Sequence, residues 1–162
     1  MEPRTNYITP AGLAALKARY DHLLGSERPE IVAIVSWAAG NGDRSENGDY
    51  LYGRKRMREI DRELAHLARR MKAAKVIDPA TQPDRDRVWF GATVTIADEQ
   101  DNLRIVTLVG DDEQDPARDR IGWSAPIASA LRAAAVGDFR TVRLPVGEKE
   151  WEVLAISYPE KR

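Results

Sequence analysis

The sequence has 162 residues, 43% of them hydrophobic and 31% charged, which suits one globular domain or two small ones. The lack of cysteine excludes disulfides, thiolate metal sites and a cysteine nucleophile, and two histidines argue against a histidine metal site or a Ser-His-Asp triad. No apolar run approaches the roughly 20 residues of a membrane-spanning helix, and residues 1–4 open no signal-peptide core. We therefore expect a cytoplasmic protein without a membrane partner that either uses carboxylate chemistry or binds a partner.

The first predicted element is a helix that begins at Thr9-Pro10, because threonine can cap a helix and proline suits its first position. Gly25 and Pro29 interrupt or bend this helix, since proline in a helix interior removes a hydrogen bond. Residues 40–42 end it. Its apolar stripe consists of Leu13, Leu16, Tyr20, Leu23, Ile31, Ile34 or Val35, and Ala38.

A second helix is predicted from about residue 45 to about residue 75, which at 1.5 Å per residue is roughly 45 Å long. Its apolar residues alternate at spacings of three and four, as in a heptad seam. Two such helices joined by a short turn should fold back as an antiparallel hairpin. The seam consists of Tyr50, Gly53, Met57, Ile60, Leu64, Leu67 and Met71.

The chain then changes character, and we expect an α+β protein whose hairpin covers 1–77, with a linker at 78–87 and a small sheet domain at 88–162. A short helix should run from Ser124, whose hydroxyl can cap it, to about Ala134. The sheet should be mainly antiparallel, with a hairpin turn at 98–102. Its strands are predicted at 88–96, 103–109, 139–144 and 151–158.

Three carboxylates, of Asp43, Glu46 and Asp49, lie where the two helices meet. One interpretation is structural, because Asp43 and Glu46 have the spacing of a capping box at the start of the second helix. The other is functional, because carboxylates are hard ligands suited to Mg²⁺ and could complete a site housed in another protein. Both interpretations can hold together.

Four cations follow the turn within five positions, at Arg54, Lys55, Arg56 and Arg58. This density favours a nearby polyanion. The alternative is an ordinary helix flank in which Arg58 and Arg62 pair with carboxylates three or four residues away. Those carboxylates belong to Glu59, Asp61 and Glu63.

Several stretches resemble one family, the Gre transcript-cleavage factors. The resemblance spans nearly the whole chain, from about Tyr7 to Tyr158, and the form of the turn around Arg44 is similar to the GreB branch. The matching stretches are 6–12, 42–50, 52–61, 88–92, 109–113 and 124–131.

The resemblance implies an FKBP-like sheet domain and a helical finger that enters the secondary channel of bacterial RNA polymerase. It implies that Asp43 and Glu46 are the two critical acids, which share the catalytic Mg²⁺ of the polymerase, and that Ser45 and Asn47 support the tip. The factor would hold no tightly bound cofactor, would not itself be an enzyme, and would act as a monomer.

The resemblance also assigns partners to two further groups of residues. The basic patch of Arg54, Lys55, Arg56 and Arg58 would face the 3′ end of the nascent RNA. Ser124 and Pro126 would contribute to docking on the polymerase. Ser124 stands where the GreB branch often has an aspartate.

Three alternatives stay open. The chain could occupy the channel as a regulator or inhibitor without stimulating cleavage, or its coiled coil could serve only to dimerise. It could also be an FKBP-like prolyl isomerase, which needs an apolar pocket lined by aromatic side chains. The candidates for such a pocket are Trp123, Trp151, Phe139 and Tyr158.

Overall fold

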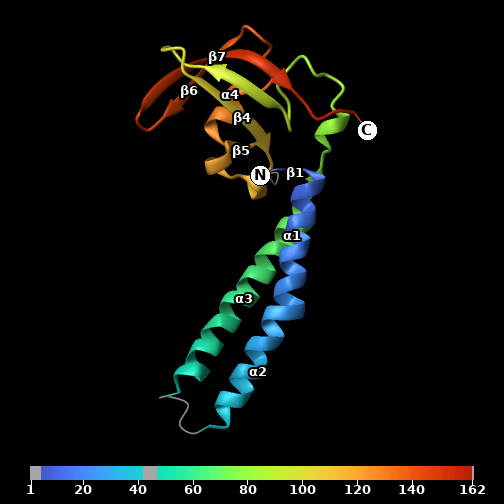
Figure 1. The fold of residues 1–162 in the computed structure, drawn as a ribbon, viewed down its shortest axis with the longest axis vertical. Helices are drawn as coiled ribbons and strands as arrows, with labels where there is room; N and C mark the ends of the chain where they lie inside the picture. Colours follow the sequence, from blue (N-terminus) through green and yellow to red (C-terminus); the bar gives the residue numbers. More distant parts are fainter. Residues whose placement is uncertain (1–4, 42–46, 162) are drawn as a thin grey trace. The chain divides into compact units, whose positions relative to one another are not determined.

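The computed structural model describes residues 5–41 and 47–161, which form two compact units (Figure 1). The helical unit is Leu13–Ala73. The sheet unit combines the segment up to Gly12 with the segment from Ala74 onward. In the part of the chain that the structure describes, no helix is both long and apolar enough to cross a membrane.

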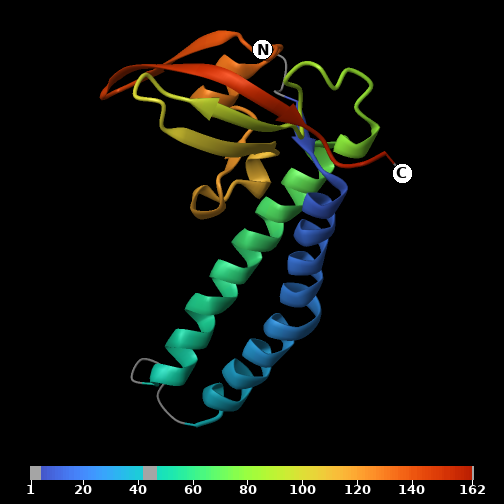
Figure 2. The ribbon, with the colours of Figure 1, turned by 45° about the horizontal axis from the view of Figure 1, so that its top comes forward.

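The helical unit confirms the predicted hairpin. Helix α1 (Pro10–His22) leads through a π-helical turn at Leu23–Glu27 into helix α2 (Arg28–Ala39), and helix α3 (Gly48–Ala73) returns beside them (Figures 1 and 2). Helix α3 begins three residues later and ends two residues earlier than the sequence predicts.

The predicted heptad seam forms the core of this unit. Leu23 and Ile60 are fully buried, and Ile31 and Leu67 are nearly so. The sequence left a choice between Ile34 and Val35, and the structure places Val35 against this core while Ile34 is 41% exposed. The partly buried side chains packed on it are Leu16, Tyr20, Val35, Met57, Leu64 and Met71.

The interruption expected at Gly25 and Pro29 is a local change of hydrogen-bond register. The N–H of Arg28 bonds to the carbonyl oxygen of Leu23, five residues earlier, and Pro29 lies in the first turn of α2. The backbone stays helical at Glu27 and Arg28, and the wider π-helical turn before Pro29 accommodates a residue that has no N–H to donate. The apolar stripe therefore continues from one helix to the next.

The sheet unit confirms the predicted α+β fold. Its larger sheet has five strands in the order β5-β4-β3-β7-β6, and all neighbours are antiparallel except the parallel pair β4–β5. Helix α4 (Pro126–Leu131) adds Ala128 and Leu131 to the sheet's core. The strands are β3 (Thr93–Ala97), β4 (Leu103–Val109), β5 (Arg120–Gly122), β6 (Phe139–Leu144) and β7 (Gly147–Ser157).

Three predicted boundaries in this unit are wrong. Residues 88–92 form a turn instead of a strand, because Gly91 has a φ of +88° and the N–H of Ala92 bonds back to Trp89. Strand β7 begins at Gly147, four residues early, because its residues 147–152 pair with the whole of β6. Helix α4 ends at Leu131 instead of Ala134.

Two short strands join the ends of the helical segment. Strand β1 (Asn6–Ile8) pairs in parallel with strand β2 (Ala74–Val76). The sequence placed both segments in the hairpin at 1–77, whereas in the structure they group with the sheet unit. Parallel pairing over a long sequence separation has no local signal, which is why the pattern of residues did not predict it.

A carboxylate from the sheet unit fixes the start of α1. Thr9 caps the helix as predicted, because its hydroxyl oxygen accepts a 3.0 Å hydrogen bond from the N–H of Gly12. The Glu113 carboxylate accepts hydrogen bonds from the backbone N–H groups of Thr9 (3.1 Å) and Gly110 (2.8 Å), and also from the Thr9 hydroxyl. Its side chain is only 5% exposed.

Candidate functional site

The two predicted acids, Asp43 and Glu46, and the predicted support residue Ser45 lie outside the described residues. The described residues on either side are well fixed. At the end of α2, the N–H groups of Gly40 and Asn41 bond to the carbonyl oxygens of Trp37 (3.2 Å) and Ala38 (3.1 Å). Helix α3 begins directly after Asn47.

The side chain of Asn47 joins the two helices at this end of the hairpin. Its carbonyl oxygen Oδ1 accepts a hydrogen bond from the N–H of Tyr50 (3.2 Å), which caps α3. Its amide nitrogen Nδ2 donates to the carbonyl oxygen of Ala38 on α2 (2.6 Å). The cap of α3 is therefore Asn47, and the predicted capping box of Asp43 and Glu46 is not what starts the described helix.

Asn47 therefore offers a matched pair of variants. Asn47→Ala removes both bonds and should lower the free energy of unfolding of the hairpin by about 2 kcal/mol, the sum of one cap and one hydrogen bond. Asn47→Asp keeps the capping oxygen but sets a second oxygen against the Ala38 carbonyl, so it should cost about 1 kcal/mol. Urea unfolding followed by helical circular dichroism measures both losses. Equal stability of the alanine variant and the parent chain would show that Asn47 does not join the helices.

The predicted basic patch divides into bound and exposed cations. Arg56 is bound on two sides, because it pairs with Glu27 across the hairpin and with Glu59 at 3.2 Å on its own helix. Arg54 lies over the Tyr50 ring, 5.9 Å from its centroid. Lys55 and Arg58 are exposed. These last two, with Arg54, are the cations best placed to meet a polyanion.

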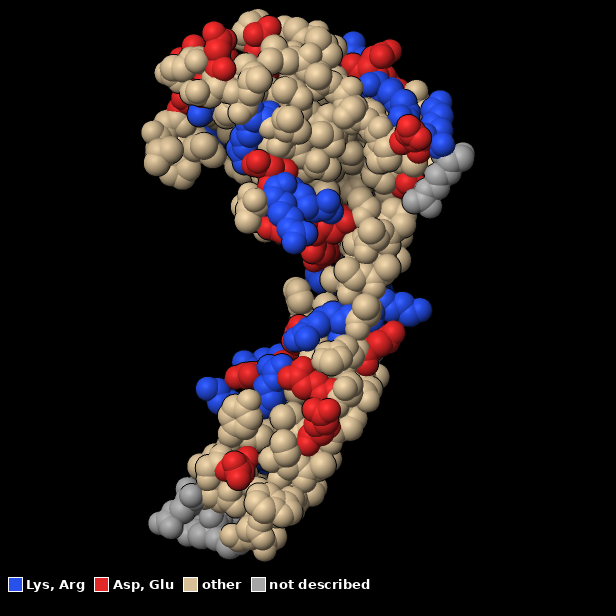
Figure 3. All heavy atoms as spheres, in the orientation of Figure 1, with Lys and Arg blue, Asp and Glu red and all other residues tan. Residues whose placement is uncertain are grey.

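The described ion pairs differ from the alternative in which Arg58 and Arg62 are the partners. Glu59 binds Arg56 on α3, and the other two carboxylates bind the opposite arm of the hairpin. Glu63 accepts a 2.9 Å bond from Arg19, and Asp61 accepts a 2.9 Å bond from Arg28. The Arg19 guanidinium lowers the pKa of Glu63 below its usual value. Figure 3 shows both signs of charge interleaved on this unit. Such exposed pairs contribute at most about 1 kcal/mol each to the free energy of unfolding. Their main effect is to fix which residues of the two arms of the hairpin lie opposite each other.

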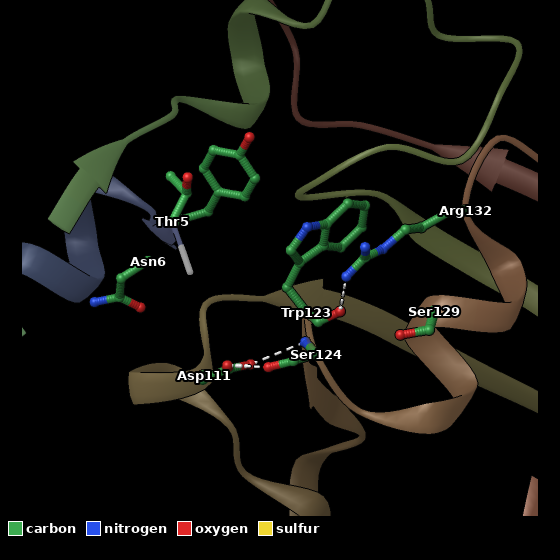
Figure 4. Close-up of a pocket in the computed structure, with 8 residues that line it drawn as sticks. Thr5, Asn6, Asp111, Trp123, Ser124, Ser129 and Arg132 are labelled. Carbon is green, nitrogen blue, oxygen red and sulfur yellow. Dashed lines mark hydrogen bonds between the residues drawn. The ribbon is translucent and has the colours of Figure 1, made fainter. Parts of the chain in front are cut away.

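Of the two predicted docking residues, Ser124 lines a cavity of about 530 Å³ in the sheet unit (Figure 4), whereas Pro126 borders a different cavity of about 360 Å³. Ser124 is bound to Asp111, because its N–H donates to the carboxylate (3.0 Å) and its hydroxyl donates to the other carboxylate oxygen. The hydroxyl therefore does not cap α4, whose predicted cap at Ser124 is wrong. Pro126 is exposed in the first turn of α4.

A cation and an aromatic ring form another wall of the cavity that Ser124 lines. The guanidinium of Arg132 lies 4.2 Å from the centroid of the Trp123 ring and donates a 2.6 Å hydrogen bond to the Trp123 carbonyl oxygen (Figure 4). Phe90 meets the same ring edge to face at 5.7 Å. Sequence reasoning missed Asp111 and Arg132, because both act through contacts between distant segments.

The four aromatic residues proposed for an isomerase pocket are not brought together. Trp123 lines the cavity beside Ser124, whereas Trp151 lies 6% exposed in the core and borders a different cavity. Phe139 is 62% exposed. The hydroxyl of Tyr158 is engaged, because it donates to the Arg87 carbonyl oxygen and accepts from the Trp89 N–H. The structure gives this alternative no assembled aromatic site.

Two family models match this chain, one over the helical hairpin and one over the small sheet that follows it. Residues 6–76 match the N-terminal domain of the GreA/GreB transcription elongation factors, and residues 82–158 match their C-terminal domain. The chain therefore belongs to the GreA/GreB family of transcription elongation factors.

Known relatives confirm the resemblance to the GreB branch. The chain is 51% identical over 153 residues to the transcription elongation factor GreB of Neisseria meningitidis serogroup B, with 94% of each chain covered. It is 44% identical to the GreB of Yersinia pestis, covering 96% of this chain and 90% of that one. Among solved structures, GreA factor homolog 1 of Thermus thermophilus aligns with 95% of this chain and 99% of its own, at 19% identity and a TM-score of 0.44.

Proposed function

We propose that this factor stimulates the RNA-cleaving activity of bacterial RNA polymerase and does not cleave RNA itself. Family membership supports a role in transcription elongation. In this proposal the hairpin enters the secondary channel of a backtracked polymerase in the cytoplasm. The factor then acts at the 3′ end of the nascent RNA, so that transcription can resume from a new end.

The observation that carries the proposal is the pair of hydrogen bonds that the Asn47 side chain makes, one with the N–H of Tyr50 and one with the carbonyl oxygen of Ala38. These two hydrogen bonds hold the start of α3 against the end of α2, on either side of the segment that contains Asp43 and Glu46. A short segment whose two ends are fixed loses less conformational entropy when its side chains bind a target. The hairpin is thus suited to presenting two carboxylates.

The donor set fits a shared magnesium ion better than a resident one. Within the residues that the structure describes, no three His, Cys, Asp or Glu side chains are grouped to hold a metal. Mg²⁺ usually takes one or two carboxylates and keeps water and phosphate oxygens as its other ligands. Asp43 and Glu46 would supply those two carboxylates, and the bound ion would supply activation of water for phosphodiester cleavage.

The exposed cations suit contact with RNA. Arg54, Lys55 and Arg58 lie in the second and third turns of α3. We propose that they bind RNA phosphates, a contact that does not depend on base sequence. Arg56 would serve a different purpose, because it is bound by Glu27 across the hairpin and by Glu59 on its own helix.

Adding the purified factor to a stalled, backtracked elongation complex tests the proposal directly. We expect the labelled RNA to be shortened from its 3′ end, at a rate well above that of the polymerase alone. Binding without shortening would favour the channel-binding inhibitor and overturn the cleavage role. Acceleration of proline isomerisation in a test peptide by the factor alone would favour the isomerase.

Ser124 should affect docking through its bond to Asp111. Ser124→Ala removes one of the two hydrogen bonds that hold the Asp111 carboxylate and leaves the bond from the backbone N–H, so we expect about 3- to 10-fold weaker binding to the polymerase. Ser129→Ala is the matched control, because Ser129 is exposed and lines the same cavity. Equilibrium binding to immobilised polymerase measures both. Equal affinities of the two variants would show that Ser124 does not contribute to docking.

A further inference from the structure

Large apolar side chains are exposed near the end of the hairpin, outside its seam. Trp37 on α2 is 65% exposed and Tyr52 on α3 is 63% exposed. Ile34, one turn before Trp37, is 41% exposed. The proposed function gives a role to the tip carboxylates and to the cations of α3, but none to these three side chains.

The ion pair between Glu27 and Arg56 shows that the three side chains share one face of the hairpin. Residues four apart on a helix lie on the same side, so Tyr52 lies one turn from Arg56. On the other helix Ile34 lies two turns from Glu27, and Trp37 follows it by three residues. We call the surface of Ile34, Trp37 and Tyr52 the aromatic face.

The charges around the aromatic face argue against a polyanion as its partner. From Pro29 to Asn41 the chain has no lysine or arginine and one charged residue, Glu30, which lies one turn before Ile34. Figure 3 shows an uncharged surface over the end of α2. Asp49 and Lys55 lie one turn from Tyr52 on either side, and Arg56 is bound by two carboxylates. Phosphates are bound by clusters of cations, which α2 does not offer.

We propose that the aromatic face docks on an apolar patch of the polymerase protein that lines the channel. The inference rests on the proposed function, in which the hairpin is surrounded by the polymerase. Exposed tryptophan and tyrosine are the side chains that most often dominate protein interfaces. The hairpin is then two-sided: α2 with Tyr52 meets protein, and the cations of α3 meet RNA.

Binding of the full-length factor to polymerase core enzyme without nucleic acid tests the inference. Trp37→Ala should weaken this binding by about 30-fold, the effect of losing an interface hot spot. Leu51→Ala is the matched control, because Leu51 is 50% exposed but lies about 100° around α3 from Tyr52. It should bind within about two-fold of the parent chain. Helical circular dichroism should be unchanged in both, since both side chains are exposed.

Each other outcome overturns the inference in a distinct way. Unchanged binding of Trp37→Ala to RNA-free polymerase, with loss of cleavage on backtracked complexes, would assign the aromatic face to RNA bases instead. A parent chain that sediments as a dimer while Trp37→Ala sediments as a monomer would assign it to a second copy. Equal losses in Trp37→Ala and Leu51→Ala would mean that no particular face docks. Failure of the parent chain to bind polymerase at all would overturn the proposed function itself, and this inference with it.

Discussion

Replacing Asp43 with asparagine and Glu46 with glutamine together should lower stimulated RNA cleavage by about 100-fold or more. Amides keep the size of the carboxylates but lose the charge that holds a divalent cation, and metal assistance is worth several kcal/mol of transition-state stabilisation. The rate of RNA shortening in backtracked complexes, measured at limiting and at saturating Mg²⁺, checks this. The defect should be larger at limiting Mg²⁺.

The control for this variant is Asp49→Asn. Asp49 is exposed in the first turn of α3, close in sequence to the two acids but outside the proposed metal-binding pair. We expect its cleavage rate to stay within a few-fold of the parent rate, as for a surface substitution. Polymerase affinity should be nearly unchanged in both variants. Full cleavage by the double variant would end the proposal that the tip acids share the catalytic ion.

Gly53→Ala should destabilise the helical unit. A Cβ atom at Gly53 would lie 2.5 Å from the Cγ2 atom of Val35 on α2, and valine has little rotamer freedom with which to move away. We expect overpacking of about 1–3 kcal/mol, which outweighs the gain of about 1 kcal/mol that alanine gives over glycine in a helix. Urea unfolding monitored by helical circular dichroism measures the difference.

Gly48→Ala provides the opposite case on the same helix. A Cβ atom at Gly48 would meet no atom within 4 Å, so the substitution should be neutral or raise the free energy of unfolding by up to about 1 kcal/mol. Opposite signs at the two glycines would show that close approach of the helices requires Gly53. A gain at Gly53 equal to that at Gly48 would mean that the helices separate easily at Val35.

The helical unit was predictable because its information is periodic and local. The alternation from Tyr50 to Met71 fixes which face of α3 is buried, and burial follows directly. The strands at 103–109 and 139–144 were predicted to the residue for the same reason. The sequence predicted an interruption near Pro29 but not a π-helical turn. A proline in a helix indicates that one hydrogen bond is lost, but it does not indicate how the neighbouring residues compensate.

The contacts around the site were harder to predict because they join distant segments. Asn47 is an ordinary helix cap in sequence, but its second bond goes to Ala38 on the other helix. Ser124 precedes a proline as a cap would, yet its hydroxyl bonds to Asp111. Short polar side chains bond to whichever backbone or side-chain group the fold brings near. Local sequence therefore identified the right residues more often than the right partners.

The Glu113 carboxylate has a consequence for attempts to divide the protein. A fragment that starts within the 78–87 linker would lack β1, β2 and Thr9. In it the Glu113 carboxylate would lose both hydrogen bonds from Thr9 and the residues that cover it, and would keep only the bond from the N–H of Gly110. Such a fragment should be a poor independent folder. A usable fragment would keep both chain ends and replace Leu13–Ala73 with a short connector, since the sheet unit is assembled from the two extremities of the chain.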